Sequence, residues 1–452
     1  MTGYILIDNK HVLFTYNEDI LTLHFDSILE GNKEELNLEK KCISKNLNYL
    51  LGYDIEKKCE IVFFTRDVPD NQSIFCSQDI KVYSYIHYAH NVQNITGMQF
   101  CSEEIDYFYD TRKGYEMTIK NIKGCELKTK EFIDTRDEIL FNDGSDNIKC
   151  ILGIVASINT NTATPVSLKS MLNLEFDETN DYDKIMKRYG IIKRFFNFIC
   201  YRKNIDFSEV ILLGKNKDGQ TVIIGKLCNN YDIGREDISI VKKIVKYDLL
   251  KSNIKEIFEL IAKDELYTQH IPNTYKEKLI ITPARFVLIT AAFEWSIRGL
   301  YKIPISEKQK KVKDDVIEAI SNISKDKEYN RDLRDKLDFY IKIVNNTDVN
   351  LSRKISHALN DLSSIIEIFI KNLFYINNKE IDSYNIIGDR IQNQRNNYAH
   401  GNIDKEMNMD VILDIIILEW VNYAMILKKV GYSDDNIKKL INVIFNRNFA
   451  IN

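Results

Sequence analysis

Proline is scarce in this chain, and no stretch is apolar for long enough to cross a bilayer. Only 5 prolines occur among 452 residues, which argues against a long Pro-rich linker. The most apolar stretch, residues 411–427, is interrupted by Asp414 and Glu419, so we interpret it as a buried helix. The first residues, MTGYILIDNK, lack the basic start and apolar run of a signal peptide. We therefore expect a cytoplasmic protein.

Cysteine pairs of the kind that bind zinc or carry redox chemistry are also missing. The 8 cysteines all precede residue 229 and none stands in a C-x-x-C pair, so we interpret them as free, buried thiols in a reducing compartment. The one close histidine pair, His87 and His90, lies in an apolar and aromatic run without a carboxylate or cysteine partner. We interpret the pair as ordinary packing and expect neither a metal nor a cofactor.

A strongly basic composition is absent as well. The net charge is −4; residues 275–452 carry 27 Lys and Arg against 24 Asp and Glu, and the remaining residues carry 35 against 42. A domain that coats duplex nucleic acid would be far more basic. We therefore expect any RNA affinity to be concentrated at a small phosphate site in the C-terminal part.

What the sequence does contain is two halves with different hydrophobic periods. The first half has short β-rich runs separated by polar turns, a pattern typical of a sandwich or curved sheet. Strands are predicted at residues 4–7, 11–16, 20–25, 59–65, 80–88, 115–119, 138–141 and 150–156. An amphipathic helix follows at 182–201, and then two strands at 210–214 and 221–226 flank the turn signal Asp218-Gly219.

From about residue 237 onward, helical spacing dominates. Thr282 and Pro283 are typical of a helix start, with Thr as the N-cap and Pro in the first turn. Helices are predicted at 237–263, 282–301, 307–325, 328–345, 350–375, 380–400, 404–430 and 434–446. The predicted fold class is therefore α+β. A β-rich, sandwich-like domain (1–232) precedes an all-α helical-bundle domain (233–452), whose core is about 276–452.

The segment 389–401, DRIQNQRNNYAHG, carries the residues best suited to chemistry. Gly401 directly after His400 is a helix C-terminal signal, so we place His400 in the last turn, where free carbonyls favour a protonated imidazole. Asn396 is four residues before His400 and shares its face, so it can orient the imidazole. Arg395 lies about 140° from His400 around an ideal helix. The two therefore converge only if the last turn distorts or a second copy supplies the partner.

These residue types suit the cleavage of RNA by its own 2′-hydroxyl group. That hydroxyl attacks the adjacent phosphorus, so a base must take its proton, an acid must protonate the leaving 5′ oxygen, and the added negative charge must be stabilised. Histidine suits both proton steps, and the planar guanidinium of arginine suits the phosphate. No metal is required. The same spacing also fits a surface arginine and a histidine that merely ends a helix.

The helical half resembles the HEPN superfamily, and within it the Apea-like HEPN domains of bacterial anti-phage proteins. The motif of that family, Arg-Asn-x-x-x-His, is matched at 395–400. The helix at 282–301 looks like the first core helix of the family, apolar with an embedded Glu294 that is followed by Arg298. The N-terminal half, including the run 95–109, is similar to those proteins in length, order and hydrophobic pattern.

This resemblance implies a metal-independent endoribonuclease that forms a homodimer with a composite active site and stops phage growth by abortive infection. It implies that Arg395 contacts the scissile phosphate, His400 transfers protons and Asn396 orients the imidazole. Glu294, Arg298 and Tyr398 would support them. An i,i+4 ion pair between Glu294 and Arg298 is an equally good interpretation of those two residues. The β-rich half would be a sensing or regulatory domain that a phage-derived trigger engages.

Two other functions stay open at this point. In the first, the helical domain binds RNA or a nucleotide without cutting it. In the other, the chain is a dimeric scaffold or regulatory protein, and the motif serves only to end a helix. Purified protein that binds RNA and leaves it intact would favour the first. Substitutions of Arg395 and His400 that change no phenotype would favour the second.

Overall fold

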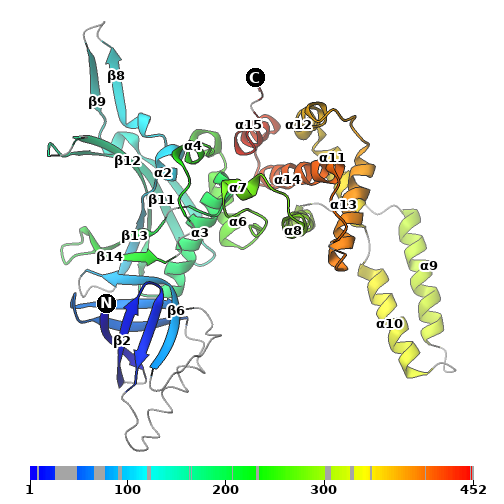
Figure 1. The fold of residues 1–452 in the computed structure, drawn as a ribbon, viewed down its shortest axis with the longest axis horizontal. Coiled ribbons are helices and arrows are strands. Elements are labelled where there is room, and N and C mark those ends of the chain that lie inside the picture. Colours follow the sequence, from blue (N-terminus) through cyan, green and yellow to red (C-terminus); the bar gives the residue numbers. More distant parts are fainter. Residues whose placement is uncertain are drawn as a thin grey trace, which may run out of the picture. The chain divides into compact units, whose positions relative to one another are not determined.

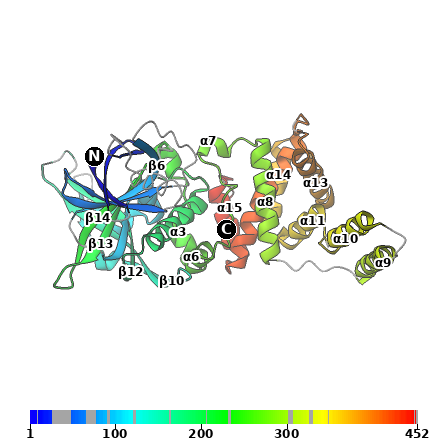
Figure 2. The same cartoon turned by 90° about the horizontal axis from the view of Figure 1, so that it is seen from below.

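The computed structural model describes residues 1–7, 10–25, 48–65, 77–89, 94–119, 124–161, 163, 165–205, 207–230, 234–300, 307–325, 330–346, 349–402, 404–447 and 449. These residues form two units, one β-rich and one helical (Figures 1 and 2). The first comprises Met1–Glu265 and Asn273–Tyr275, and the second comprises Leu266–Pro272 and Lys276–Asn452. The expected α+β class, with a β-rich N-terminal part and a helical C-terminal part, is confirmed.

Six described strands of the first unit close into a barrel. They are β1 (Thr2–Ile7), β2 (Lys10–Asn17), β3 (Ile20–His24), β4 (Tyr49–Asp54), β5 (Cys59–Thr65) and β6 (Ser77–Tyr88). Neighbours pair antiparallel in the order β1-β2-β3-β6-β5-β4, and β4 returns to β1. Alternate apolar side chains fill the interior, among them Ile5, Phe14, Leu21 and Phe63. Closure pairs the strand edges that would otherwise be open.

The barrel continues into an open sheet through β6, and this differs from the sandwich that the strand pattern suggested. The sheet runs β10-β11-β12-β7-β13-β14-β6. Its strands are β7 (Ile95–Phe100), β10 (Asp137–Asn142), β11 (Asn147–Ile158), β12 (Val166–Thr179), β13 (Glu209–Lys215) and β14 (Thr221–Asn229). Because β6 is 12 residues long, it pairs with β3 through its first part and with β14 through its last part. A separate hairpin joins β8 (Tyr115–Ile119) to β9 (Cys125–Thr129).

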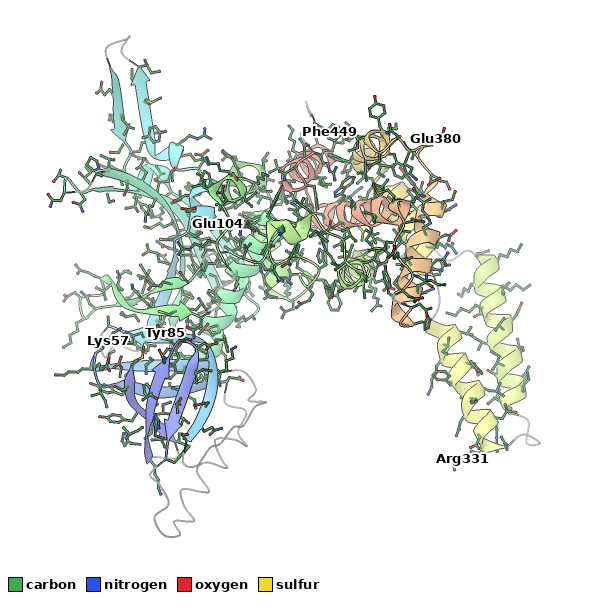
Figure 3. All side chains as sticks on the ribbon, viewed as in Figure 1. Lys57, Tyr85, Glu104, Arg331, Glu380 and Phe449 are labelled. Atoms are coloured by element: carbon green, nitrogen blue, oxygen red, sulfur yellow. The ribbon has the colours of Figure 1, made fainter. Side chains whose placement is uncertain are left out.

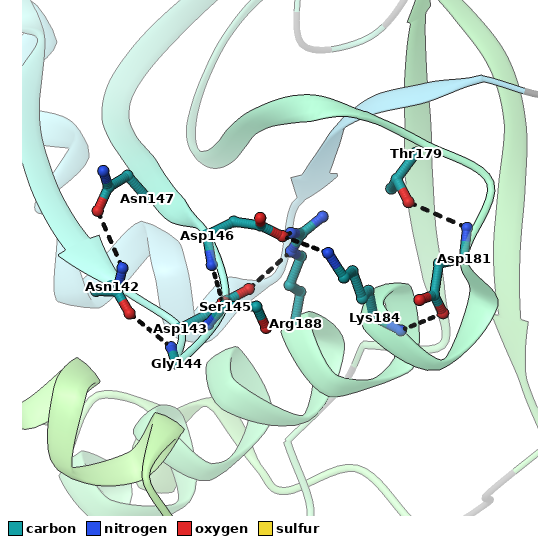
Figure 4. Close-up of polar contacts among 10 residues, drawn as sticks. All are labelled: Asn142, Asp143, Gly144, Ser145, Asp146, Asn147, Thr179, Asp181, Lys184 and Arg188. Carbon is teal, nitrogen blue, oxygen red and sulfur yellow. Dashed lines mark hydrogen bonds and ion pairs between the residues drawn. The ribbon is translucent and has the colours of Figure 1, made fainter.

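Helix α3 (Tyr182–Cys200), predicted at 182–201, is fixed to the turn between β10 and β11 by buried charges (Figure 4). The guanidinium of Arg188, only 1% exposed, donates to Asp143 at 3.0 Å and to Asp146 at 2.6 Å. Lys184 also donates to Asp146, at 2.9 Å. Asp181 caps the start of the helix by accepting the Lys184 N–H at 3.1 Å. The helix therefore cannot slide along the sheet without breaking these contacts.

The segment predicted as one helix at 237–263 forms three short helices instead, α4 (Ile238–Val241), α5 (Tyr247–Leu250) and α6 (Ile254–Ala262). The chain is extended at Lys246 (φ −81°, ψ 150°), which allows Val245 and Tyr247 on either side of it to be buried. Phe258 of α6 stacks on Phe141 of β10 and on Phe195 of α3. These helices therefore belong to the β-rich unit, so its boundary lies near residue 265 and not at 232.

The second unit is built from helices. They are α7 (Tyr275–Lys278), α8 (Pro283–Leu300), α9 (Glu307–Ser324), α10 (Arg331–Asn346), α11 (Leu351–Asp361), α12 (Ser363–Ile376), α13 (Tyr384–Ala399), α14 (Met409–Lys429) and α15 (Asp434–Ile444). The single helix predicted at 350–375 is divided at Leu362, which is fully buried. Helix α14 packs against α8, α12, α13 and α15. Helix α9 packs against α10, which begins at Arg331 (Figure 3).

The described helices include none that is long and apolar enough to cross a membrane. Residues 411–427 form the buried helix that the sequence predicted, within α14. The predicted helix end at 301, the predicted helix start at 328 and His90 lie outside the described residues.

Gly388 allows α13 to approach α11 closely. A Cβ atom at this position would lie 2.5 Å from the Ser352 carbonyl oxygen and 2.9 Å from its hydroxyl oxygen. Ser352 is also tied to α13 itself, because its N–H donates to Gln392 at 3.0 Å and its hydroxyl donates to Asp389 at 2.5 Å. The serine therefore has little room to move away from an added methyl group.

We predict that Gly388→Ala lowers the free energy of unfolding by about 1–3 kcal/mol, since it overpacks the contact between α11 and α13. Gly299→Ala in α8 is the matched control, because the nearest atom to its added Cβ is Lys429 Nζ at 3.8 Å. Alanine there should be neutral or stabilise by up to ~1 kcal/mol. Denaturant unfolding followed by circular dichroism measures both. Equal effects of the two substitutions would contradict the packing argument.

Candidate active site at the end of helix α13

The predicted catalytic segment ends α13 as the sequence suggested. His400 is the C-cap residue (φ −94°, ψ 10°) and Gly401 has a φ of +78°. The N–H of Gly401 donates to the Tyr398 carbonyl at 3.1 Å, and the N–H of Asn402 donates to the Asn397 carbonyl at 2.9 Å. This is the Schellman arrangement, which needs a left-handed residue and therefore favours glycine. The glycine turns the chain directly after the imidazole-bearing residue.

The helix end leaves the predicted catalytic side chains accessible. His400 and Asn396 are exposed, and the Arg395 side chain is 39% exposed. The His400 N–H donates to the backbone carbonyl of Asn396 at 3.0 Å, but the described residues show no hydrogen bond from the Asn396 side chain to the imidazole. The orienting role of Asn396 therefore stays a prediction, whereas access of a phosphate to Arg395 and His400 is sterically open.

Glu294 of α8 is the charged partner of Arg395. Its Oε2 lies 3.6 Å from Nη2 of Arg395, at a point where α8 and α13 pack together. The alternative pair, Glu294 with Arg298, is not formed among the described residues, and Arg298 is exposed. A partly exposed ion pair contributes about 0–1 kcal/mol to stability. Its main effect is therefore to direct the guanidinium, and only the family resemblance, not the spacing, singled out Glu294.

Tyr398 and Gln394 anchor the end of α13. Tyr398 is largely buried, and its ring meets that of Phe286 of α8 edge-on, with centroids 5.7 Å apart. Gln394 is also buried and donates to the Lys405 carbonyl at 3.0 Å, which ties down the segment that follows the motif. Tyr398 is therefore a packing residue of the site.

Residues 287–436 match the model of the Apea-like HEPN family. This stretch of the chain is a HEPN-type domain. The matched stretch runs from α8 to the start of α15 and contains both Glu294 and the segment 395–400. The resemblance inferred for the helical half is thereby confirmed. No curated protein and no solved structure matches the chain. At family level, the domain that these residues form is thus of the HEPN nuclease and RNA-binding type.

Two buried carboxylates hold the HEPN helices that carry the site. Arg390 of α13 donates to Asp414 of α14 through two hydrogen bonds, at 2.6 and 2.8 Å, and Asp414 is fully buried. Arg285 of α8 donates to Glu419 of α14 at 2.6 Å, and both side chains are over 90% buried. These acids are the two that interrupt the apolar run 411–427. The two acids could be recognised in the sequence because they interrupt an apolar run. Their partners, Arg390 and Arg285, could not be identified from the sequence.

The pair between Arg390 and Asp414 is sensitive to the loss of either member. Burial raises the pKa of Asp414 to about 6, and the hydrogen bonds from Arg390 offset part of this effect. Without Arg390, the folded-state pKa of Asp414 would rise further above that of the unfolded chain. The free energy of unfolding of such a variant is therefore higher at low pH, where Asp414 is protonated. It falls as the pH rises through the folded-state pKa.

We predict that Arg390→Met lowers the free energy of unfolding by about 3–5 kcal/mol at pH 8, because it leaves a buried carboxylate without its partner. The loss should be smaller at pH 5, where Asp414 is protonated. The double variant Arg390→Met, Asp414→Leu should recover most of the stability. Denaturant titrations at the two pH values measure this. A double variant as unstable as the single one would contradict the pairing.

Proposed function

We propose that this HEPN protein is a metal-independent endoribonuclease in which Arg395 and His400 act on the same phosphodiester. The observation that supports this most is the placement of the motif. An exposed imidazole caps α13 and an accessible guanidinium lies just over one turn before it, on a helix held by buried ion pairs. Rigid support for exposed reactive groups is what positional catalysis requires.

The reaction follows from the chemistry of the two groups. The 2′-hydroxyl oxygen attacks the adjacent phosphorus and loses its proton to a base, while the 5′ oxygen leaves and takes a proton from an acid. The imidazole of His400 serves one of these proton transfers, and the guanidinium of Arg395 stabilises the charge that develops on the phosphate oxygens. The products are one RNA end with a 2′,3′-cyclic phosphate and one with a 5′-hydroxyl.

A second copy of the chain completes the proposed site. The reaction needs both a base and an acid, and the motif supplies one histidine per chain. The other described histidines of the HEPN unit are His270, which is buried, and His357, which lies on α11. A homodimer that joins two α13 ends would bring two imidazoles and two guanidinium groups to one phosphodiester. Gel filtration with light scattering measures the oligomeric state, and a strictly monomeric active enzyme would exclude this assembly.

The biological role that we propose is anti-phage defence by abortive infection, with the β-rich unit as the sensor of a phage-derived trigger. Two observations support this role. The matched family model is the Apea-like HEPN model, and a β-rich unit precedes the matched residues. The cleaved RNA would be bound at the α13 end, since residues 275–452 carry a small excess of positive charge.

His400→Ala should lower the rate of RNA cleavage by about 10²–10⁴-fold, because a proton-transfer group is lost. Arg395→Ala should lower it by about 10²–10³-fold, because the phosphate loses a charged donor. Rates come from purified protein acting on labelled RNA in the presence of EDTA. Asn393→Ala, an exposed change on the same helix, is the control and should cleave normally.

The nature of the RNA ends and of the substrate separates this mechanism from others. RNA that carries a 2′-deoxy residue at the cut site should stay intact and should compete with the normal substrate. Cleavage that leaves 3′-hydroxyl ends, that stops when EDTA is added before mixing, or that acts equally on DNA would exclude the mechanism. RNA that is bound tightly but never cut, with and without phage extract, would favour the RNA-binding alternative.

Glu294→Gln should lower kcat by up to about 10²-fold, because a misplaced catalytic group can cost that much, and should leave the free energy of unfolding nearly unchanged. The reason is that the Glu294 carboxylate directs the guanidinium of Arg395 but contributes little to stability. Kinetics and denaturant unfolding on the same preparation test both parts. Arg298→Gln, which alters an exposed arginine of the same helix, is the matched control. An equal loss of kcat in both variants would argue against positioning by Glu294.

A further inference from the structure

Three side chains with metal-binding atoms meet at one end of the barrel. Asp54 is the last residue of β4 and Cys59 the first residue of β5, and they pair directly across the hairpin. His87 lies on β6 opposite Ile61, and Ile61 shares a face of β5 with Cys59 because side chains alternate along a strand. The fold thus places on one face three residues that the sequence separates by up to 33 positions.

Two of the distances between the donor atoms are close to those of a metal site. Cys59 Sγ lies 3.2 Å from His87 Nε2, and that nitrogen lies 3.4 Å from Oδ2 of Asp54. All three donor atoms lie within 4.8 Å of one another. A tetrahedral zinc ion with Zn–N and Zn–O bonds near 2.0–2.1 Å and Zn–S bonds near 2.3 Å separates its ligand atoms by about 3.3–3.6 Å. The two shorter distances, 3.2 and 3.4 Å, lie at or near this range.

The buried carboxyl group of Asp54 has no lysine or arginine partner among the described residues. Asp54 is fully buried, and its Oδ1 accepts the N–H groups of Glu56 at 2.9 Å and Lys57 at 3.3 Å. Its Oδ2 faces His87, and no described lysine or arginine forms an ion pair with it. An unpaired buried carboxylate is costly, and a cation would balance it.

We propose that Asp54, Cys59 and His87 bind one zinc ion, with a water molecule as the fourth ligand. A set of one sulfur, one nitrogen and one oxygen donor suits zinc and not magnesium or calcium, which take oxygen ligands. On binding, the Cys59 thiol loses its proton to solvent, as metal binding to cysteine requires. One Zn²⁺ with one thiolate and one carboxylate is electrically neutral, so the occupied site would carry no net charge.

The ion would fasten β6 to the β4–β5 hairpin, whose turn holds Lys57 (Figure 3). His87 is the most accessible of the three ligands, at 17% side-chain exposure, and marks the side from which zinc and the fourth ligand enter. The sequence did not reveal this site, because no two of its ligands stand at a metal-binding spacing and His87 was interpreted as packing. The cluster lies in the β-rich unit, so the proposal is independent of the nuclease function.

The test measures zinc on the full-length protein purified without chelators. Mass spectrometry of the metal content should give one zinc per chain, and titration of the metal-stripped protein should restore it. Cys59→Ser and His87→Gln should each weaken zinc binding by at least ~100-fold, more than the usual effect of losing a residue that only supports a ligand. Cys101→Ser, which alters an exposed thiol, is the matched control and should bind zinc as the wild type does.

Cobalt substitution reports the ligand atom directly. The Co²⁺ protein should show a thiolate-to-cobalt charge-transfer band that is absent in Cys59→Ser and present in Cys101→Ser. Circular dichroism checks that each variant folds; if Cys59→Ser or His87→Gln does not, the wild-type zinc content and cobalt spectrum decide. Wild-type protein that takes up no zinc, or ligand variants that bind zinc like the control, would overturn the proposal. RNA cleavage assayed in the same preparations shows separately whether the nuclease function stands.

Discussion

Two carboxylates buried in α14 fix the geometry on which the rest of the HEPN unit depends. Asp414 binds Arg390 of α13, and Glu419 binds Arg285 of α8. Because an unpaired buried charge is costly, each carboxylate specifies where its partner helix must lie. Helix α13 carries Arg395 and α8 carries Glu294, so the ion pairs in the interior determine which charged groups meet at the surface.

The same unit shows a division between rigid and accessible parts. Gly388 lets α13 pack tightly against α11, and Tyr398 and Gln394 hold its last turn. The groups suited to chemistry begin where that packing ends, at the guanidinium of Arg395 and the imidazole of His400. A reactive pair on a fixed helix end needs no rearrangement of the core to receive a phosphate. What it needs is a second proton-transfer group, which favours an assembly of two copies.

Local patterns predicted much of this fold and the end of α13. Helix periodicity, the Thr282-Pro283 start and the His400-Gly401 end depend on neighbouring residues, and all three agree with the structure. Closure of the barrel did not follow from the sequence, because it depends on pairing between β1 and β4 and between β5 and β6. The prediction of one helix at 237–263 was wrong for a similar reason. Burial of Tyr247 against Phe108 and Tyr109 of the same unit outweighed local helical spacing.

In the candidate sites, too, the sequence predicted contacts between neighbouring residues but not contacts between distant ones. The motif at 395–400 is contiguous in sequence, so it was readable, and the resemblance added Glu294. The structure then selected Arg395 and not Arg298 as the partner of Glu294, a choice that depends on how α8 packs on α13. Asp54, Cys59 and His87 come together only through strand register. Spacing along the chain carries no information about such contacts.

For the proposed cleavage, Arg395 and His400 must reach the same phosphodiester. The most direct measurement is a structure of the protein bound to RNA with a 2′-deoxy residue at the cut site. In that complex we expect one phosphate to accept hydrogen bonds of about 2.7–3.2 Å from the Arg395 guanidinium. A His400 imidazole, from the same chain or its twin, should lie within reach of the 2′ or 5′ oxygen. RNA bound elsewhere on the protein, with both side chains free of phosphate, would contradict it.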